Sequence, residues 1–350
     1  MNATHPISPP VTREALRARI DRVPRVDLAH RPTPLEACER LSAALGGPPL
    51  YVKRDDLTGL ALGGNKLRQL EFLFARILEQ GADIVVAGAY SQSNWCRQIT
   101  ASARKLGLDV ALVLLHGEKG PTRQGNLLLD ALMGADITVI DGNDMQKLPP
   151  HLADKAESLR QQGRRPYLID PFSLDILAPS TIGYVDAACE IDEQLEALGV
   201  RARHIYVCGA NMTPAGLALG FRALGRPIQV TGVSPVRWDE PRNTDIARIA
   251  TAAARLLDLD MELQPQDIHN TDDYIGERYG VVTPAGREAM RLAARYEGLI
   301  LDPVYTSKAL AGLIDHIRGG RIGPDEPVVF VHTGGVPALF AYAEDVLVEP

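Results

Sequence analysis

A lysine stands at the end of a glycine-rich loop, directly before a predicted helix. The loop reads Leu-Ala-Leu-Gly-Gly-Asn-Lys over residues 60–66, and apolar residues recur at helical spacing from Leu67 onwards. Glycine and asparagine allow backbone angles that other residues avoid, so this loop can place Lys66 at a helix N-terminus. The helix dipole disfavours a cation there and lowers the pKa of the amine, which would make Lys66 a candidate nucleophile. A capping turn with a solvated lysine is the alternative.

A second loop, residues 89–95, also joins a predicted strand to a predicted helix. Its Ser93 and Asn94 are residue types that commonly cap helices. The free backbone N–H groups behind such a cap could hold a carboxylate or a phosphate. An ordinary N-cap without a ligand is the alternative.

A third loop reads Cys-Gly-Ala-Asn-Met-Thr-Pro-Ala-Gly over residues 208–216. Gly209, Asn211 and the hydroxyl of Thr213, with Pro214 at the first helical position, could form an anion cradle. The loop has neither the Lys-Ser/Thr of a P-loop nor the GxGxxG pattern. By itself it is therefore only a weak indication of a phosphate site.

The C-terminal part supplies aromatic and hydroxyl groups: Tyr279, the pair Tyr305-Thr306, and His-Thr-Gly-Gly-Val-Pro at residues 332–337. Tyrosines serve more often as amphipathic core residues than as acids or bases. The eight histidines are scattered, and neither HExxH nor GxSxG occurs. The sequence therefore disfavours a zinc enzyme and a serine hydrolase, and we expect no bound metal.

An alternation of predicted strands and helices positions these loops. Short runs rich in β-branched residues read as buried strands, each followed by a loop and a helical pattern. Continuous apolar strands between helices indicate an α/β fold with parallel sheets covered on both faces, whose ligands bind at the carboxyl ends of the strands. The predicted strands span residues 83–88, 109–115, 136–140, 204–208, 228–233 and 328–331.

The chain has no low-complexity linker, so two domains, if present, interleave. A candidate seam runs from residues 162–166 through Pro171 and Pro179, where polar and proline-rich residues separate two runs of alternating elements.

Composition and charge limit the class of protein. Of the 350 residues 45% are hydrophobic, which is enough for one large core or two smaller ones. The formal net charge of -7 disfavours nucleic acid as a partner. Four scattered cysteines favour a reducing compartment, and no stretch approaches about eighteen consecutive apolar residues. We therefore expect a cytoplasmic protein that does not contact the membrane.

Six segments, in order along nearly the whole chain, form a recognisable combination. They are RPTPLE at 31–36, YVKRDDLTGLALGGNKLRQLEFL at 51–73, SQSNWCRQ at 91–98, TPAGL at 213–217, LDPVYTSKAL at 301–310 and HTGG at 332–335. Together they resemble the D-cysteine desulfhydrase and 1-aminocyclopropane-1-carboxylate deaminase family of pyridoxal-phosphate enzymes. The most specific part of the resemblance is KRDD followed by GGNK and QSN.

The resemblance implies a fold and an assembly. The fold is tryptophan-synthase-β-like (pyridoxal-phosphate fold type II), an α/β class with two interleaved three-layer domains and parallel sheets. Residues 1–68 and 177–350 would form the larger cofactor-binding domain, and residues 69–176 a smaller inserted domain. The cofactor, pyridoxal 5'-phosphate, would lie between them, and the protein would be a homodimer.

The resemblance also assigns roles to individual residues. Lys66 matches the Schiff-base lysine, and a desolvated lysine that can lose its proton suits that chemistry. Ser93, Tyr279 and Tyr305 match the other catalytic side chains, and which group removes the α-proton stays open. The residues matched to cofactor binding are Lys66, Asn94, Gly209, Ala210, Asn211, Met212, Thr213, Thr306 and Thr333. The residues matched to substrate binding are Gln92, Ser93, Asn94 and Trp95.

Thr306 and Thr333 distinguish activities within the family. The cyclopropane deaminases have Glu after the tyrosine and Leu after the histidine, whereas both positions are Thr here. A neutral hydroxyl would leave the pyridine nitrogen mostly unprotonated, which favours expulsion of a good β leaving group. The expected reaction is α,β-elimination from a small β-substituted amino acid to pyruvate and ammonia, as in D-cysteine desulfhydrase. The alternatives are an L-cysteate sulfo-lyase, then a 1-aminocyclopropane-1-carboxylate deaminase, or a cofactor-binding relative without lyase activity.

Three departures from the family pattern predict an unusual substrate. The loop 209–213 has Asn211 and Met212 where the family has two glycines, and we expect Asn211 to adopt a positive φ, which Met tolerates poorly. Trp95 replaces the His of desulfhydrases and the Gln of deaminases. It either faces the pocket as an apolar wall or packs into the core. Pro-Phe-Ser at residues 171–173 stands where Gly-Gly-Ser is expected.

Overall fold

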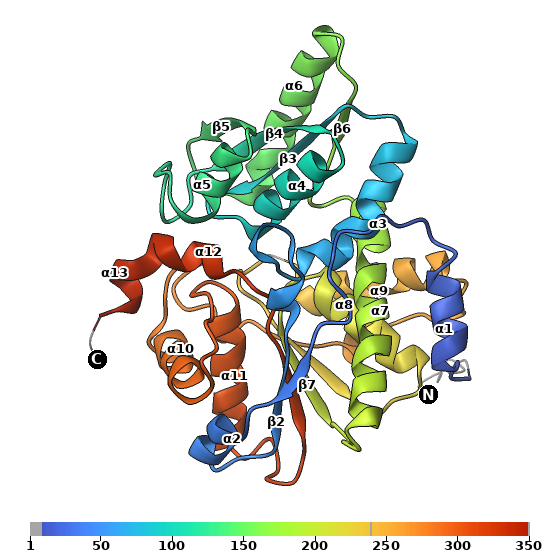
Figure 1. The fold of residues 1–350 in the computed structure, drawn as a ribbon, viewed down its shortest axis with the longest axis vertical. Helices are drawn as coiled ribbons and strands as arrows, with labels where there is room; N and C mark the ends of the chain where they lie inside the picture. The colour runs from blue at the N-terminus through green and yellow to red at the C-terminus, as the bar shows by residue number, and fades with distance from the viewer. Residues whose placement is uncertain (1–8, 239, 349–350) are drawn as a thin grey trace.

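The chain folds around two sheets, one in each of two units that lie one above the other in Figure 1. The computed structural model describes residues 9–238 and 240–348. The larger sheet has six strands in the order β1-β2-β10-β7-β8-β9, and the smaller has four in the order β5-β4-β3-β6. Every pairing is parallel except that of β1 with β2. The predicted α/β class with parallel sheets is confirmed.

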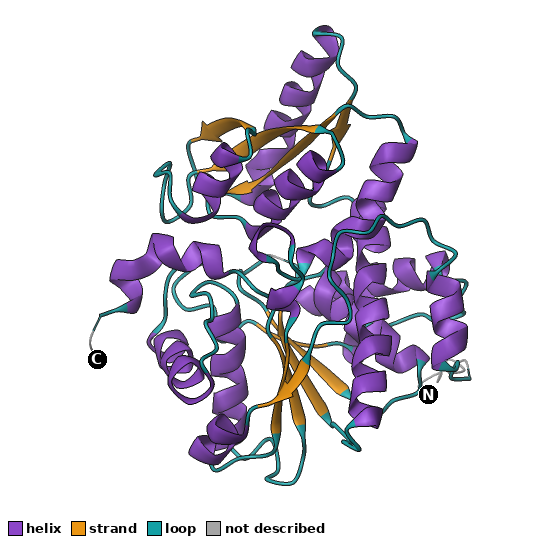
Figure 2. Cartoon of the chain, viewed as in Figure 1, coloured by secondary structure: helices purple, strands orange, loops and turns teal. Residues whose placement is uncertain are grey.

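The larger unit carries helices on both faces of its sheet (Figure 2). Alternation along the strands explains this, because Val328 and Phe330 of β10 face one core while Val329 and Val331 face the other. The strands are β1 (Leu35–Ala37), β2 (Leu50–Lys53), β7 (His204–Cys208), β8 (Gln229–Val233), β9 (His269–Thr271) and β10 (Val328–Val331). The helices are α1 (Arg13–Ile20), α2 (Glu39–Leu45), α7 (Leu174–Ala197), α8 (Met212–Ala223), α9 (Arg242–Leu256), α10 (Pro284–Glu297), α11 (Thr306–Arg318), α12 (Val336–Leu339) and α13 (Ala343–Val346).

The smaller unit repeats this arrangement. Val85 and Ala87 of β3 pack into a core with α3 and α4, whereas Ile84 and Val86 pack against α6. Its strands are β3 (Ile84–Tyr90), β4 (Asp109–Leu115), β5 (Asp136–Ile140) and β6 (Pro166–Leu168). The helices are α3 (Lys66–Glu79), α4 (Asn94–Lys105), α5 (Gly125–Leu132) and α6 (Leu148–Gln161).

Helices α3 and α7 connect the two units. The predicted boundaries at residues 68/69 and 176/177 both fall inside these helices. The helices touch closely, because a Cβ added to Gly183 of α7 would lie 2.1 Å from the carbonyl oxygen of Arg68. The boundaries stay a prediction, with α3 and α7 continuous across them. Among the described residues, no helix is both long and apolar enough to cross a membrane.

Candidate active site

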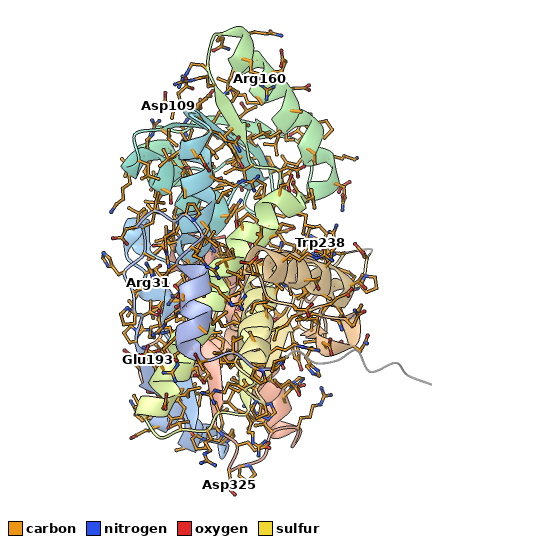
Figure 3. All side chains as sticks on the ribbon, turned by 90° about the vertical axis from the view of Figure 1, so that its right-hand side faces the viewer. Arg31, Asp109, Arg160, Glu193, Trp238 and Asp325 are labelled. Atoms are coloured by element: carbon orange, nitrogen blue, oxygen red, sulfur yellow. The ribbon has the colours of Figure 1, made fainter. Side chains whose placement is uncertain are left out.

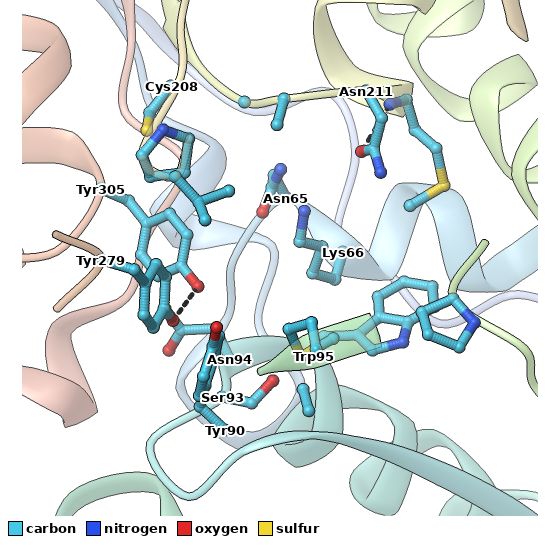
Figure 4. Close-up of a pocket in the computed structure, with 18 of the residues that line it drawn as sticks. Asn65, Lys66, Tyr90, Ser93, Asn94, Trp95, Cys208, Asn211, Tyr279 and Tyr305 are labelled. Carbon is cyan, nitrogen blue, oxygen red and sulfur yellow. Dashed lines mark hydrogen bonds between the residues drawn. The ribbon is translucent and has the colours of Figure 1, made fainter. Parts of the chain in front are cut away.

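A pocket lies between the two units, at the carboxyl ends of strands from both sheets (Figure 4). Its walls come from the start of α3 and from the segments that follow β3, β7, β8 and β10. This is the position predicted for the three loops. Lys66 is the single charged side chain among the described residues that line the pocket.

The loop before Lys66 needs both of its glycines. Gly63 has φ 63° and Gly64 has φ 124°, which are angles that favour glycine. Added Cβ atoms would lie 2.1 Å from the carbonyl oxygen of Asp56 and 2.5 Å from Nε2 of Gln98, respectively. The tight turn delivers Lys66 as the first residue of α3, as predicted. Burial lowers the pKa of Lys66 to about 8, so desolvation is the main cause of the shift that the sequence analysis attributed to the helix dipole.

Asn65 is a site residue that was not predicted from the sequence. It lines the pocket, and its backbone N–H donates to the carbonyl oxygen of Thr333 at 3.0 Å. Its Nδ2 donates to Oγ1 of Thr213 at 3.0 Å, and Nε2 of Gln69 donates to the same oxygen at 2.9 Å. Asn65 thus joins the start of α3 to the end of β10 and to α8. Its place directly before Lys66 was the signal that could have identified it.

The second loop ends in a helix cap. Ser93 is the N-cap of α4, and its Oγ accepts from the backbone N–H of Cys96 at 3.2 Å. Asn94 starts the helix, and its Oδ1 accepts from Nδ2 of Asn126 at 2.8 Å. Ser93, Asn94 and Trp95 all line the pocket. The first amides of α4, which have no partner within the helix, therefore lie beside Lys66.

Gln92 was predicted to bind substrate, but its side chain forms its hydrogen bonds outside the pocket. Its Oε1 accepts from the backbone N–H of Asn126 at 2.9 Å, and its Nε2 donates to the carbonyl oxygen of Gln124 at 2.9 Å. It does not line the pocket. The side chain holds the start of α5 against the 90–95 loop, and its role in substrate binding stays a prediction.

The third loop forms the opposite wall of the pocket. Gly209, Ala210, Asn211 and Met212 line it, and Met212 is the first residue of α8. Asn211 has φ −156° and ψ −103°, so the expected positive φ is wrong. The physical reason is a cap: Oδ1 of Asn211 accepts from the backbone N–H of Met212 at 2.7 Å. Met212 consequently needs no unusual backbone angle.

Three tyrosines form one side of the pocket. The hydroxyls of Tyr279 and Tyr305 are hydrogen-bonded at 2.5 Å, and the ring of Tyr90 stacks on Tyr279 with centroids 4.3 Å apart. Figure 4 shows this hydrogen bond across the pocket from Asn211. Burial raises the pKa values of Tyr279 and Tyr305 well above 10. Both phenols are therefore protonated at neutral pH and are poor bases. Because one hydroxyl donates to the other, the pair has one O–H proton left for a ligand.

The two threonines that were matched to the pyridine edge differ in position. Thr333 lines the pocket, whereas Thr306 is buried and does not. Oγ1 of Thr306 donates to Oδ1 of Asp302 at 2.7 Å and accepts from the backbone N–H of Asp302 at 2.8 Å. Thr213, matched to the phosphate loop, is likewise buried behind the pocket wall.

Sequence and structure comparisons match known proteins over nearly the whole chain. The family described as pyridoxal-phosphate dependent enzyme matches residues 26–334. D-cysteine desulfhydrases of Salmonella newport (strain SL254) and Salmonella typhi are each 41% identical over 328 residues, covering 92% of this chain and 97% of the relative.

Comparison with solved structures identifies proteins with the same fold. The crystal structure of an ACC deaminase homologue has a TM-score of 0.85 at 36% identity and covers 98% of this chain and 99% of that one. A threonine deaminase from Solanum lycopersicum, at 17% identity and a TM-score of 0.63, covers 96% of this chain and 90% of its own and shares the fold. The chain therefore belongs to the pyridoxal-phosphate dependent enzyme family and has its type II fold.

Proposed function

We propose that this protein is a pyridoxal-phosphate dependent lyase of the D-cysteine desulfhydrase kind. It would eliminate the β-substituent of a small amino acid and release pyruvate and ammonia. The observation that carries the proposal is Lys66, a buried amine with its pKa lowered to about 8, in one pocket with two helix N-termini. The 41% identity to D-cysteine desulfhydrases supports the type of reaction.

The residues present fit the cofactor. Lys66 would bind its aldehyde carbon, and the amides of residues 210–213 at the start of α8 would bind its phosphate. A side chain at position 209 would collide with the following helix turn, because a Cβ added to Gly209 would lie 2.9 Å from Cδ of Pro214. The N–H of Met212 already bonds Oδ1 of Asn211, so that side chain competes with the phosphate for one donor. When bound, pyridoxal phosphate acts as an electron sink for charge that develops at the α-carbon of the substrate.

The side chains of the pocket would supply the base, the carboxylate site and the proton donor of the reaction. Lys66 would be the best base available in the pocket for the α-proton, because an amine with a pKa near 8 is partly neutral at neutral pH. The N-terminus of α4, behind Ser93 and Asn94, would hold the substrate carboxylate. One of the two hydroxyls of Tyr279 and Tyr305 donates to the other, and the proton of the second would be available for the departing group.

The pocket disfavours the closest alternative. An L-cysteate sulfo-lyase expels sulfite from a sulfonate, and burying an anion is costly unless a cation pairs with it in addition to its hydrogen bonds. Lys66 is the sole charged side chain among the described lining residues, and the cofactor would occupy it. The deaminase alternative stays less favoured because Thr306 and Thr333 replace the Glu and Leu of that group.

We also propose that the protein acts in the cytoplasm as a homodimer. All four cysteines are free and buried, and burial raises the pKa of Cys38 to about 12 and that of Cys189 to about 12, which keeps both thiols unreactive. Large apolar side chains are exposed on the described surface, including Leu132 on α5 and Phe340 beside α12, and a second copy could cover them.

The test is a screen with a site-specific control. Purified protein with pyridoxal phosphate should release pyruvate and ammonia from D-cysteine or another β-substituted alanine, and Lys66→Ala should abolish this. Borohydride reduction followed by peptide mapping should place the cofactor on Lys66. The matched control is Lys308, a second buried lysine with a lowered pKa, whose amine donates to the carbonyl oxygen of Ile275 outside the pocket. An adduct on Lys308, or a Lys66-bound cofactor without turnover of any such amino acid, would refute the proposal.

A further inference from the structure

We propose that the preferred substrate carries a bulky apolar β-substituent, as in S-aryl- and S-alkyl-cysteines, rather than a free thiol. The proposal rests on the proposed lyase function and names its substrate class. It follows from the part of the pocket beyond Lys66, which we call the apolar chamber. The chamber is lined by Trp95, Met145, Pro171, Phe172, Ile176, Leu177, Met212, Pro235, Val236 and Trp238.

The chamber is continuous with the reacting centre. Trp95 is the second residue of α4, directly after the proposed carboxylate site at Ser93 and Asn94. Figure 4 shows its indole beside the side chain of Lys66 and on the far side of the pocket from Tyr279. A substrate held between Lys66 and the start of α4 would therefore direct one of its substituents along this indole.

The walls of the chamber are held in place by their own packing. Trp95 is partly buried and packs against the hydrophobic cores of both units. It also lines the pocket, so the two alternatives, a pocket wall and a core residue, both hold. Phe172 and Trp238 meet edge to face, with centroids 5.7 Å apart and an interplanar angle of 83°. The guanidinium of Arg242 lies 4.7 Å from the centroid of the Trp238 ring. Figure 3 shows Trp238 at the level between the two units.

Charge and polarity favour an apolar occupant. No charged side chain other than Lys66 lines the pocket among the described residues, so a charged β-substituent would lose its hydration without gaining a partner of opposite charge in the chamber. A thiol or hydroxyl as small as that of cysteine or serine would contact few of these apolar side chains. A thioether needs no hydrogen-bond partner, and sulfur and aryl groups contact aromatic side chains favourably.

The reaction balances without an additional reactant. The Cα–H bond and the Cβ–S bond of the S-substituted cysteine break, and the pair of electrons from Cα forms the Cα–Cβ double bond. The thiolate takes a proton and leaves as a thiol. Water then hydrolyses the remaining three-carbon fragment, so that R–S–CH2–CH(NH3+)–COO− and water give R–SH, pyruvate and NH4+.

Kinetics with matched substrates test the proposal. For the accepted configuration, kcat/KM for S-phenylcysteine should exceed that for free cysteine by at least about tenfold. Trp95→His should reduce this ratio by about tenfold, and Phe172→Ala should reduce it in the same direction. Tyr296→Ala, which removes an aromatic ring outside the pocket on α10, should leave the ratio unchanged.

Fluorescence gives a readout that does not need turnover. The chain has two tryptophans, Trp95 and Trp238, and both line this pocket. 3-Phenylpropionate, which lacks an amino group and cannot react, should change the tryptophan emission of the holoenzyme in a saturable way. Propionate should bind at least about tenfold more weakly. Trp95→His should weaken binding of 3-phenylpropionate, and Tyr296→Ala should not.

The outcomes separate this inference from the function on which it rests. Turnover of free cysteine at or above the efficiency of S-phenylcysteine would overturn the inference and leave the lyase function standing. An unchanged ratio in both Trp95→His and Phe172→Ala would do the same. Saturable binding of 3-phenylpropionate with no release of pyruvate from any substrate would instead refute the lyase function.

Discussion

The lowered pKa of Lys66 predicts how the rate of cofactor capture depends on pH. Only the neutral amine attacks an aldehyde, and burial lowers the pKa of this amine from 10.5 to about 8. At pH 7 roughly one amine in eleven is then neutral, against about one in three thousand for a lysine with the unshifted value. The pocket therefore raises the reactive fraction about 300-fold at neutral pH. The rate should rise about tenfold per pH unit below pH 7 and level off above pH 9.

Stopped-flow absorbance of cofactor-free protein mixed with pyridoxal phosphate measures this rate. The buffers should span pH 6 to 10 at constant ionic strength, and Lys308→Met serves as the control because its amine lies outside the pocket. We expect the same midpoint, near pH 8, in the wild type and in this control. A rate that still climbs tenfold per unit between pH 9 and pH 10 would show an amine with an ordinary pKa. It would refute the argument from burial.

Three further predictions concern the surroundings of the site. Cys96→Ala should keep most of the activity, because burial raises the pKa of this fully buried thiol and leaves it unreactive; a loss in kcat beyond about a hundredfold, roughly 2.7 kcal/mol of barrier, would indicate a chemical role. Asn211→Gly should bind pyridoxal phosphate equally well or more tightly in a titration, since it frees the N–H of Met212; a large loss of affinity would show that the Asn211 side chain itself binds the cofactor. Arg68→Met should lower the free energy of unfolding by about 3–5 kcal/mol, because it leaves the buried carboxylates of Asp55 and Glu190 without their guanidinium. Urea denaturation measures this change, and an unchanged midpoint of the unfolding transition would contradict the prediction.

Five of the six strands that the sequence predicted consist mostly of buried residues, whereas β5 has no buried residue and was predicted from its β-branched run alone. β3, β4, β5, β7, β8 and β10 begin and end within one or two residues of the predicted ranges, because a continuous run of β-branched and apolar residues marks them. β1, β6 and β9 were missed because each has three residues and no fully buried position. β2 was missed for another reason. It ends in Lys53, a charged residue that breaks the apolar pattern although it is completely buried.

The sequence predicted those parts of the site whose structure depends on neighbouring residues in the chain. The glycines before Lys66 and the cap at Ser93 act within a few residues of themselves, so their types indicated their structure. Gln92 and Thr306 depend on partners that only the fold supplies, Asn126 for the former and Asp302 for the latter. Asn211 shows the same limit, because a residue that tolerates positive φ can instead cap a helix through its side chain.

The KRDD segment, the part of the resemblance with no evident chemistry, gains a role from the structure. Asp55 accepts two hydrogen bonds from Arg68, at 3.0 Å and 2.9 Å, and Arg68 also pairs with Glu190 of α7. Although burial alone would raise the pKa of Glu190, Arg68 and Lys53 lower it to about 2, so this carboxylate stays charged at neutral pH.

Such a buried cluster is weak evidence for added stability, but it tolerates few alternative arrangements, since any shift would leave a charge without its partner. Arg68 lies two residues after Lys66 on α3, while Asp55 and Lys53 come from the end of β2 and the turn that follows it. The cluster therefore fixes the start of α3 relative to the larger sheet and to α7. The position of the reactive amine depends on these four charges as well as on the glycine turn that immediately precedes it.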